Sequence, residues 1–76
     1  MYITITITIN NKSYDIKVDN RQKICECIKV LKSRIEIIDD TDIHFFKSYI
    51  HNRIVSKYLT FEEARIFSGD ILSGIE

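Results

Sequence analysis

Two cysteines are the residues of this sequence whose side chains are most readily used in chemistry. Cys25 and Cys27 stand two positions apart in a segment with helical periodicity, and such positions point roughly 200° apart around a helix. They therefore cannot form a disulfide with each other or hold one metal ion together. We predict that Cys27 packs on the inner side of the helix and that Cys25 is a free or half-exposed thiol.

The two histidines offer no clear catalytic or metal site. His44 and His51 have no cysteine or carboxylate at ligand spacing. His44 with Asp42 comes closest to an acid–base pair, but neighbouring loop residues of these types are common by chance. The sequence has no recognisable Ser/His/Asp, Cys/His or paired-carboxylate set, so we predict a protein that is not an enzyme and binds no cofactor.

An acidic run, Asp39, Asp40 and Asp42, invites comparison with a calcium-binding loop. The run lacks the glycine and the distal glutamate that such loops require. We interpret it as a solvated acidic turn and predict no metal site.

Length and composition limit the class of protein. The 76 residues include 45% hydrophobic and 29% charged residues, which indicates one folded domain over 1–76 rather than a disordered chain. Eleven basic residues balance 11 acidic ones, which argues against nucleic acid as the main partner. No apolar run is long enough to span a membrane and no export signal is visible, so we expect no membrane insertion and a cytoplasmic location.

The first half of the chain predicts a hairpin followed by a helix. Residues 2–9 alternate strictly, which places the isoleucines on one face and the threonines on the other. Residues 10–12 can turn the chain because asparagine tolerates positive φ, and alternation resumes over 14–18. From Gln22 onward the apolar spacing becomes helical, at Ile24, Cys27, Ile28, Leu31 and Ile35. Asp19 or Asn20 is the candidate cap of this helix.

The second half predicts three further strands. Residues 43–50 form the third, with Phe46 and Ile50 inward, because the opposite register would bury Lys47. A turn over 51–53 leads into a short fourth strand at 54–55. Residues 60–63, Thr-Phe-Glu-Glu, form a capping box before a short helical turn that ends at Ile66 and Phe67. Gly69 supplies a positive φ, and 71–73 begin the last strand.

This order of elements resembles the β-grasp fold of ubiquitin, an α+β fold in which a mixed sheet of four to five strands packs on one amphipathic helix. The sequence from Thr60 to Glu63, followed by Ile66, resembles the Thr-Leu-Ser-Asp turn before ubiquitin's last strand. The segment 66–72, Ile-Phe-Ser-Gly-Asp-Ile-Leu, fits the Ile-x-x-Gly-Asp-x-Leu pattern of a bacterial ubiquitin-like family called YukD in bacilli and EsaB in staphylococci. The resemblance implies a small cytoplasmic accessory or regulatory component of Gram-positive type VII (WXG-substrate) secretion, acting by binding.

Two features qualify the resemblance. Gly74 stands where that family's last strand usually carries an inward apolar residue, and we interpret it as a bulge or a frayed strand end. The sequence finishes Leu-Ser-Gly-Ile-Glu, without the Gly-Gly tail that conjugated modifiers and sulfur carriers present to an adenylating enzyme. We therefore expect a protein that is not conjugated, and a sulfur carrier or modifier remains the alternative only if a Gly-Gly end is produced.

In a β-grasp domain the helix covers one sheet face and leaves the other open. On that open face we predict a partner-binding surface of apolar residues with a basic rim, with Ile75 at its margin: Phe45, Lys47, Tyr49, Ile71 and Ser73. Two alternatives stay open. The aromatic residues cap the edge of the core, or the chain associates weakly with itself through the outer face of strand one (Tyr2, Thr4, Thr6, Thr8) or through an exposed edge strand.

Overall fold

A computed structural model of the chain describes residues 1–34 and 43–75. It contains β1 (Tyr2–Ile9), β2 (Lys12–Asp19), α1 (Ile24–Arg34), β3 (Phe45–Ser48), β4 (Arg53–Ser56) and β5 (Ile71–Ile75). Several predicted features lie outside the described residues: Ile35 of the helical stripe, the acidic run over 39–42 and the terminal Glu76.

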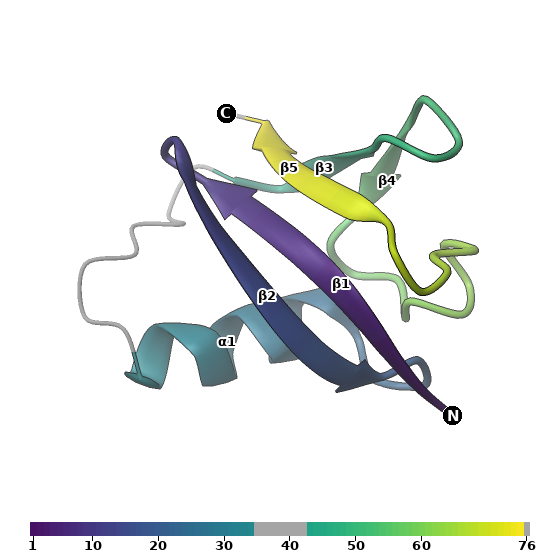
Figure 1. The fold of residues 1–76 in the computed structure, drawn as a ribbon, viewed down its shortest axis with the longest axis horizontal. Coiled ribbons are helices and arrows are strands. Elements are labelled where there is room, and N and C mark those ends of the chain that lie inside the picture. Colours follow the sequence, from purple (N-terminus) through teal and green to yellow (C-terminus); the bar gives the residue numbers. More distant parts are fainter. Residues whose placement is uncertain (35–42, 76) are drawn as a thin grey trace.

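The five strands form one mixed sheet in the order β2-β1-β5-β3-β4 (Figure 1). The central strands β1 and β5 are parallel, and the remaining neighbours are antiparallel. Helix α1 packs across one face of this sheet, so that a single layer of helix covers a single layer of strands (Figure 1). The predicted α+β class, with a mixed sheet on one amphipathic helix, is confirmed.

The β1–β2 hairpin forms as the sequence predicts. Asn10 and Asn11 have φ values of 52° and 64°, and Ile9 pairs with Lys12 across this two-residue loop. Two consecutive positive φ values define the turn type whose twist matches that of the flanking strands. Within β1 all four isoleucines are buried, so the predicted alternation of the strand is confirmed.

The core lies between α1 and the covered face of the sheet. The buried side of the helix is the predicted apolar stripe, as far as the described residues extend: Ile24, Cys27, Ile28 and Leu31. These side chains belong to one cluster with the isoleucines of β1 and with Phe46, Phe61 and Leu72, which are fully buried. One continuous hydrophobic core therefore holds the helix to the sheet.

The start of α1 is capped by backbone from another segment. The amides of Ile24 and Cys25 donate to the carbonyls of Leu59 and Lys57, at 2.9 and 2.8 Å. The predicted side-chain cap at Asp19 or Asn20 is therefore wrong. The segment after β4 has supplied the acceptors that the first helical amides require, which sequence spacing does not reveal.

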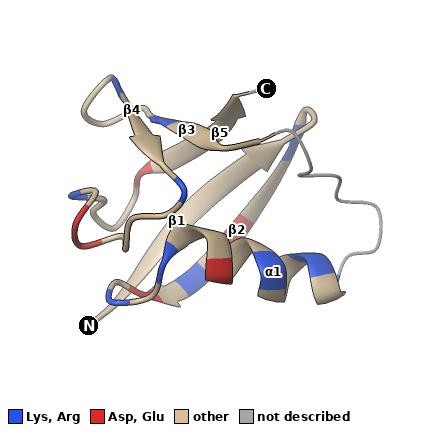
Figure 2. Cartoon of the chain, turned by 180° about the vertical axis from the view of Figure 1, so that it is seen from behind, with Lys and Arg blue, Asp and Glu red and all other residues tan. Residues whose placement is uncertain are grey.

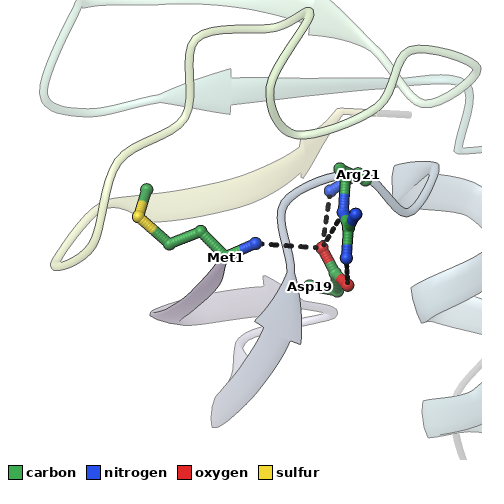
Figure 3. A network of polar contacts seen from close by, with 3 residues as sticks. All are labelled: Met1, Asp19 and Arg21. Atoms are coloured by element: carbon green, nitrogen blue, oxygen red, sulfur yellow. Dashed lines mark hydrogen bonds and ion pairs between the residues drawn. The ribbon is translucent and has the colours of Figure 1, made fainter.

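Asp19 instead organises the corner between β2 and α1 (Figure 3). Its carboxylate accepts hydrogen bonds from the backbone amide and the guanidinium of Arg21 at 3.0 to 3.2 Å. The amino group of Met1 lies 3.6 Å from the same carboxylate. Two positive groups and one amide thus converge on Asp19, and Arg21 in particular lowers the pKa of its carboxyl group well below the usual range.

The capping box is confirmed in both directions. The Glu63 amide donates to the Thr60 hydroxyl, and the Thr60 amide donates to the Glu63 carboxylate. The chain then makes a single turn that closes at Arg65, whose φ is 56°. The amides of Arg65 and Ile66 donate to the carbonyls of Glu62 and Phe61, which is the hydrogen-bond pair of a Schellman motif. The buried Ile66 and Phe61 complete it, so the segment reverses direction within one turn.

The third strand is shorter than predicted. It covers Phe45–Ser48 rather than 43–50. The Tyr49 amide still donates to the Ile71 carbonyl, in register with the β3–β5 ladder, but the Ile50 amide donates to the Asp70 carboxylate instead of to β5 backbone. Ile50 is 52% exposed, so its predicted inward position is wrong. Phe46 is buried as predicted, and the second inward residue is Ser48.

Gly74 lies in regular strand pairing opposite Phe46, so our interpretation of a bulge or frayed end is wrong. A Cβ atom at Gly74 would lie 3.0 Å from the terminal methyl group of Ile43. The missing side chain of β5 is therefore replaced by a buried isoleucine that arrives from the segment before β3.

Truncating the core should destabilise the protein without changing its surface. Ile5 is 1% exposed and Leu31 is 9% exposed, so Ile5→Ala or Leu31→Ala should lower the free energy of unfolding by about 2–5 kcal/mol. Urea unfolding followed by circular dichroism measures this. A loss below about 1 kcal/mol at either position would contradict the assigned core.

Acid should weaken the fold through Asp19 and Glu63. Hydrogen bonds from Arg21 and Thr60, respectively, lower the pKa values of these carboxyl groups below their usual values of 3.8 and 4.5. Carboxyl groups with a lowered folded-state pKa stabilise the fold above the unfolded pKa, and this contribution is lost as pH falls. The free energy of unfolding should therefore begin to fall near pH 4.5 and continue to fall below it.

The double variant Asp19→Asn, Glu63→Gln isolates this effect. Its free energy of unfolding should depend less on pH below about 4.5 than that of the wild type, as measured by urea unfolding at a series of pH values. Because both carboxylates are solvent-accessible, added salt should also reduce the wild-type slope. An unchanged slope in the double variant would contradict the assignment.

Candidate interaction surface

The open face of the sheet gathers the residues predicted to bind a partner. In the β3–β5 ladder Phe45 pairs with Ile75 and Lys47 with Ser73, and side chains of directly paired residues share a face. Because Phe46, between Phe45 and Lys47, is buried in the core cluster that includes the inner side of α1, Phe45 and Lys47 point to the opposite face of the sheet. The predicted facing of Phe45 and Lys47 is confirmed.

The face extends beyond the predicted set on both sides. On one side Thr6 and Thr8 of β1 pair with Ile71 and Ser73 of β5. On the other, Ile54 of β4 pairs with Lys47. Ile54 was missed because the two-residue fourth strand predicted from sequence gave no facing, whereas the ladder fixes it.

Four large apolar side chains of this face are accessible to solvent. Their exposed fractions are 50% for Phe45, 57% for Tyr49, 62% for Ile54 and 40% for Ile71. Lys47, Ser73 and Ile75 are half-buried between them. We call these seven residues the open-face surface. Exposed aromatic and aliphatic side chains are typical of the centre of a protein interface, whereas lysine is depleted there.

Lys47 and Tyr49 make the polar centre of the open-face surface. The Lys47 ammonium lies 5.8 Å from the centre of the Tyr49 ring, within cation–π range. Such a contact orients the ring while leaving most of it exposed. A partner would therefore meet an aromatic side chain whose position is already restricted.

A buried carboxylate fixes the two segments that present this surface. Asp70 is fully buried and accepts hydrogen bonds from the Ser48 hydroxyl at 2.5 Å, the Ile50 amide at 3.1 Å and the Ile71 amide at 2.7 Å. The Tyr49 amide donates to the Ile71 carbonyl. Asp70 thus ties the end of β3 to the start of β5, which places Tyr49 beside Ile71.

The Ile-x-x-Gly-Asp-x-Leu segment consequently has a structural role at each of its fixed positions. Ile66 and Leu72 are core residues, Gly69 has a φ of 92°, and Asp70 is the buried acceptor. The sequence indicated the positive φ at Gly69. It gave no sign of the Ser48–Asp70 pair, because residues 22 positions apart become neighbours only through the β3–β5 pairing.

The cysteines and histidines considered for other chemistry are not among the seven residues of the open-face surface, although His44 directly precedes Phe45. Cys25 is half-buried and Cys27 buried, both as free thiols, which confirms the predicted packing. Burial raises the pKa of Cys27 to about 11, which keeps its sulfur protonated and poorly nucleophilic. His51 stacks edge-on against Phe67, with ring centres 5.5 Å apart.

Within residues 1–34 and 43–75, no group of three or more histidine, cysteine, aspartate or glutamate side chains is placed to hold a metal ion. In the same part of the chain, no helix has the length and apolar character needed to cross a membrane.

Asp70→Ala should destabilise the fold strongly, since it leaves a buried hydroxyl and two amides without their acceptor. We expect the free energy of unfolding to fall by about 3 kcal/mol or more. Asp70→Asn is the matched control: its carbonyl can still accept from the amides and its NH₂ group can donate to the Ser48 hydroxyl, so the loss should be less than half as large. Equal losses in urea unfolding would contradict a role based on hydrogen bonding.

Comparison with known proteins identifies the fold and nothing finer. No protein-family model matches the sequence, and no curated protein matches it. Among solved structures, a protein described as designed de novo on the basis of ubiquitin superposes with a TM-score of 0.71, covering 97% of this chain and 87% of that one at 18% sequence identity. At that identity the similarity establishes a ubiquitin-like β-grasp fold alone.

Proposed function

We propose that this ubiquitin-like domain is a non-enzymatic, non-conjugated protein-binding module that serves as a cytoplasmic accessory or regulatory component of a Gram-positive type VII (WXG-substrate) secretion system. The open-face surface supports the binding role. The resemblance of residues 66–72 to the YukD and EsaB family supports the biological setting.

The observation that carries the proposal is the exposure of Phe45, Tyr49, Ile54 and Ile71 on one face. Single exposed apolar residues are ordinary, but these four, on β3, β4, β5 and the turn after β3, form a patch of the kind that often marks an interaction site. All four lie outside the buried core. Their exposure lowers the solubility of the protein and does not contribute to the packing of its core.

The residues of the 66–72 motif and the residues of the open-face surface have different roles. Of the fixed positions of the 66–72 segment, Ile66, Asp70 and Leu72 are buried and Gly69 forms a turn, so none of them presents a side chain to a partner. Only Ile71, at a variable position, is exposed on the open face. We infer that the motif preserves the shape of the surface while Phe45, Tyr49 and Ile54 determine what it binds.

The partner that best fits this proposal is a cytosolic domain of the membrane apparatus. The open-face surface is apolar with one central amine, which suits an apolar patch that includes a carboxylate. If genes for WXG substrates and a secretion ATPase do not neighbour the gene for this chain, the proposed setting fails while the fold and the surface remain.

Replacing two exposed side chains should abolish capture of that partner. Tyr49→Ala combined with Ile54→Ala should weaken binding at least about tenfold, because truncation of central aromatic and aliphatic anchors commonly has this effect. The measurement is affinity capture with the tagged chain, followed by isothermal titration calorimetry with the recombinant cytosolic domain. Stability should change by less than about 0.5 kcal/mol, since both residues are exposed.

Tyr58→Ala is the matched control. Tyr58 is 58% exposed but lies in the loop after β4, outside the open-face surface, so its removal should leave binding unchanged. If Tyr58→Ala weakens binding as much as the double variant, the surface is misassigned. An intact mass from cells that reveals attachment to another protein would contradict the non-conjugated role.

A further inference from the structure

Strand β2 forms one edge of the sheet and is long for an edge strand. It has eight residues, whereas β4 at the opposite edge has four. In the part of the chain that the structure describes, no strand pairs with the outer side of β2 (Figure 1). A free edge of this length is a template for pairing with another extended segment.

The hydrogen bonds of β1 determine which backbone groups of β2 face outward. The Thr6 amide donates to the Asp70 carbonyl, toward β5, so the isoleucines of β1 direct their amides and carbonyls toward β2. Their partners in β2 include Tyr14, Ile16 and Val18. The alternate residues Ser13, Asp15 and Lys17 therefore direct their amides and carbonyls to the outside.

We propose that this edge pairs in antiparallel fashion with the same edge of a second copy of this chain, in the register centred on Ile16. In that register Asp15 lies opposite the partner's Lys17, and Lys17 lies opposite the partner's Asp15. Two unlike charge pairs then flank the twofold axis.

Charge selects this register over its neighbours. Centring the pair on Asp15 would place two aspartates opposite each other, and centring it on Lys17 would place two lysines opposite each other. Like charges directly opposite across a strand pair are destabilising, whereas unlike charges are stabilising. Figure 2 shows both signs of charge along β2.

The chain as a whole has a formal net charge of zero, so no long-range repulsion opposes association of two copies.

Both charged side chains are available for the pairing. Asp15 lies on the open face and accepts a hydrogen bond from the Thr6 hydroxyl at 2.6 Å. A carboxylate has further lone pairs, so this contact does not compete with a lysine. The Lys17 ammonium lies 5.4 Å from the centre of the Tyr2 ring on the same face, which positions it without neutralising it.

Apolar groups on the helix side of β2 would support the same register. Tyr14 and Ile16 are only partly buried in one copy. The register places Ile16 opposite the partner's Ile16 and Tyr14 opposite the partner's Val18. Beside them lies a groove of about 290 Å³ between β2 and α1, lined by Ile16, Val18, Cys27, Val30 and Leu31 among others. Val30 is 50% exposed there, so pairing removes further apolar surface from water.

The test is a charge exchange at the two central positions. Asp15→Lys leaves two basic side chains flanking Ile16, and Lys17→Asp leaves two acidic ones. Each variant alone should dimerise at least about tenfold more weakly than the wild type, because both unlike pairs become like pairs. An equimolar mixture of the two variants should form a heterodimer with an affinity close to that of the wild-type dimer.

Analytical ultracentrifugation of the full chain at up to about 0.5 mM, a range suited to a small interface, gives the association constants. Native mass spectrometry identifies the heterodimer by mass. Glu26→Lys and Lys57→Asp are matched controls, since they change exposed or half-exposed charges outside β2 and should dimerise as the wild type does. Circular dichroism checks that each variant is folded.

Three outcomes would overturn the proposal. The wild type could remain a monomer at about 0.5 mM, either variant alone could dimerise as well as the wild type, or the mixture could fail to form the heterodimer. In the first case, β2 amide resonances that shift on addition of an extended peptide would assign the edge to a different kind of partner. The open-face surface lies outside the proposed contact between the two β2 edges, so loss of dimerisation would leave the proposed binding function intact.

Discussion

Strict alternation of side chains between two sheet faces is the constraint on which the rest of this structure depends. β1 places four isoleucines against α1 and its threonines on the other side, and it pairs with both β2 and β5. A shift of one residue in either pairing would exchange the covered and the open face of the neighbouring strand. Because β5 in turn pairs with β3, the register of β1 determines which residues of β3 reach solvent.

Hydrogen bonds between segments distant in sequence fix how the ends of the strands and the start of α1 are placed relative to one another. Asp70 ties the end of β3 to the start of β5, and the carbonyls of Lys57 and Leu59 receive the first amides of α1. Neither arrangement is set by local preference. Both satisfy polar groups that would otherwise be buried without partners, which is why the segments can pack closely at these points.

The sheet offers two kinds of surface that do not overlap. The open-face surface is made of side chains, from β3, β4, β5 and the Tyr49 turn, and its apolar character suits a partner of another kind. The edge of β2 is made of backbone amides and carbonyls with alternating charges, which suits a second copy. Occupation of one leaves the other accessible, so a dimer would present two open faces on one continuous sheet.

The sequence by itself determined the elements whose signals are local. Alternation predicted β1, paired asparagines predicted the hairpin turn, helical spacing predicted α1, and Thr60 with Glu63 predicted the capping box, because each depends on residues within a few positions. Lys47 also predicted the facing of β3, since burying its amine would be costly. Only the tertiary structure decided the end of β3, the exposed position of Ile50, the replacement of a β5 side chain by Ile43, the cap of α1 and the inclusion of Ile54 in the surface. These features depend on contacts between segments far apart in the chain. In such contacts a carbonyl of one segment accepts a hydrogen bond from an amide of another, or a methyl group of one segment fills a space left by another. A local sequence pattern does not encode these contacts.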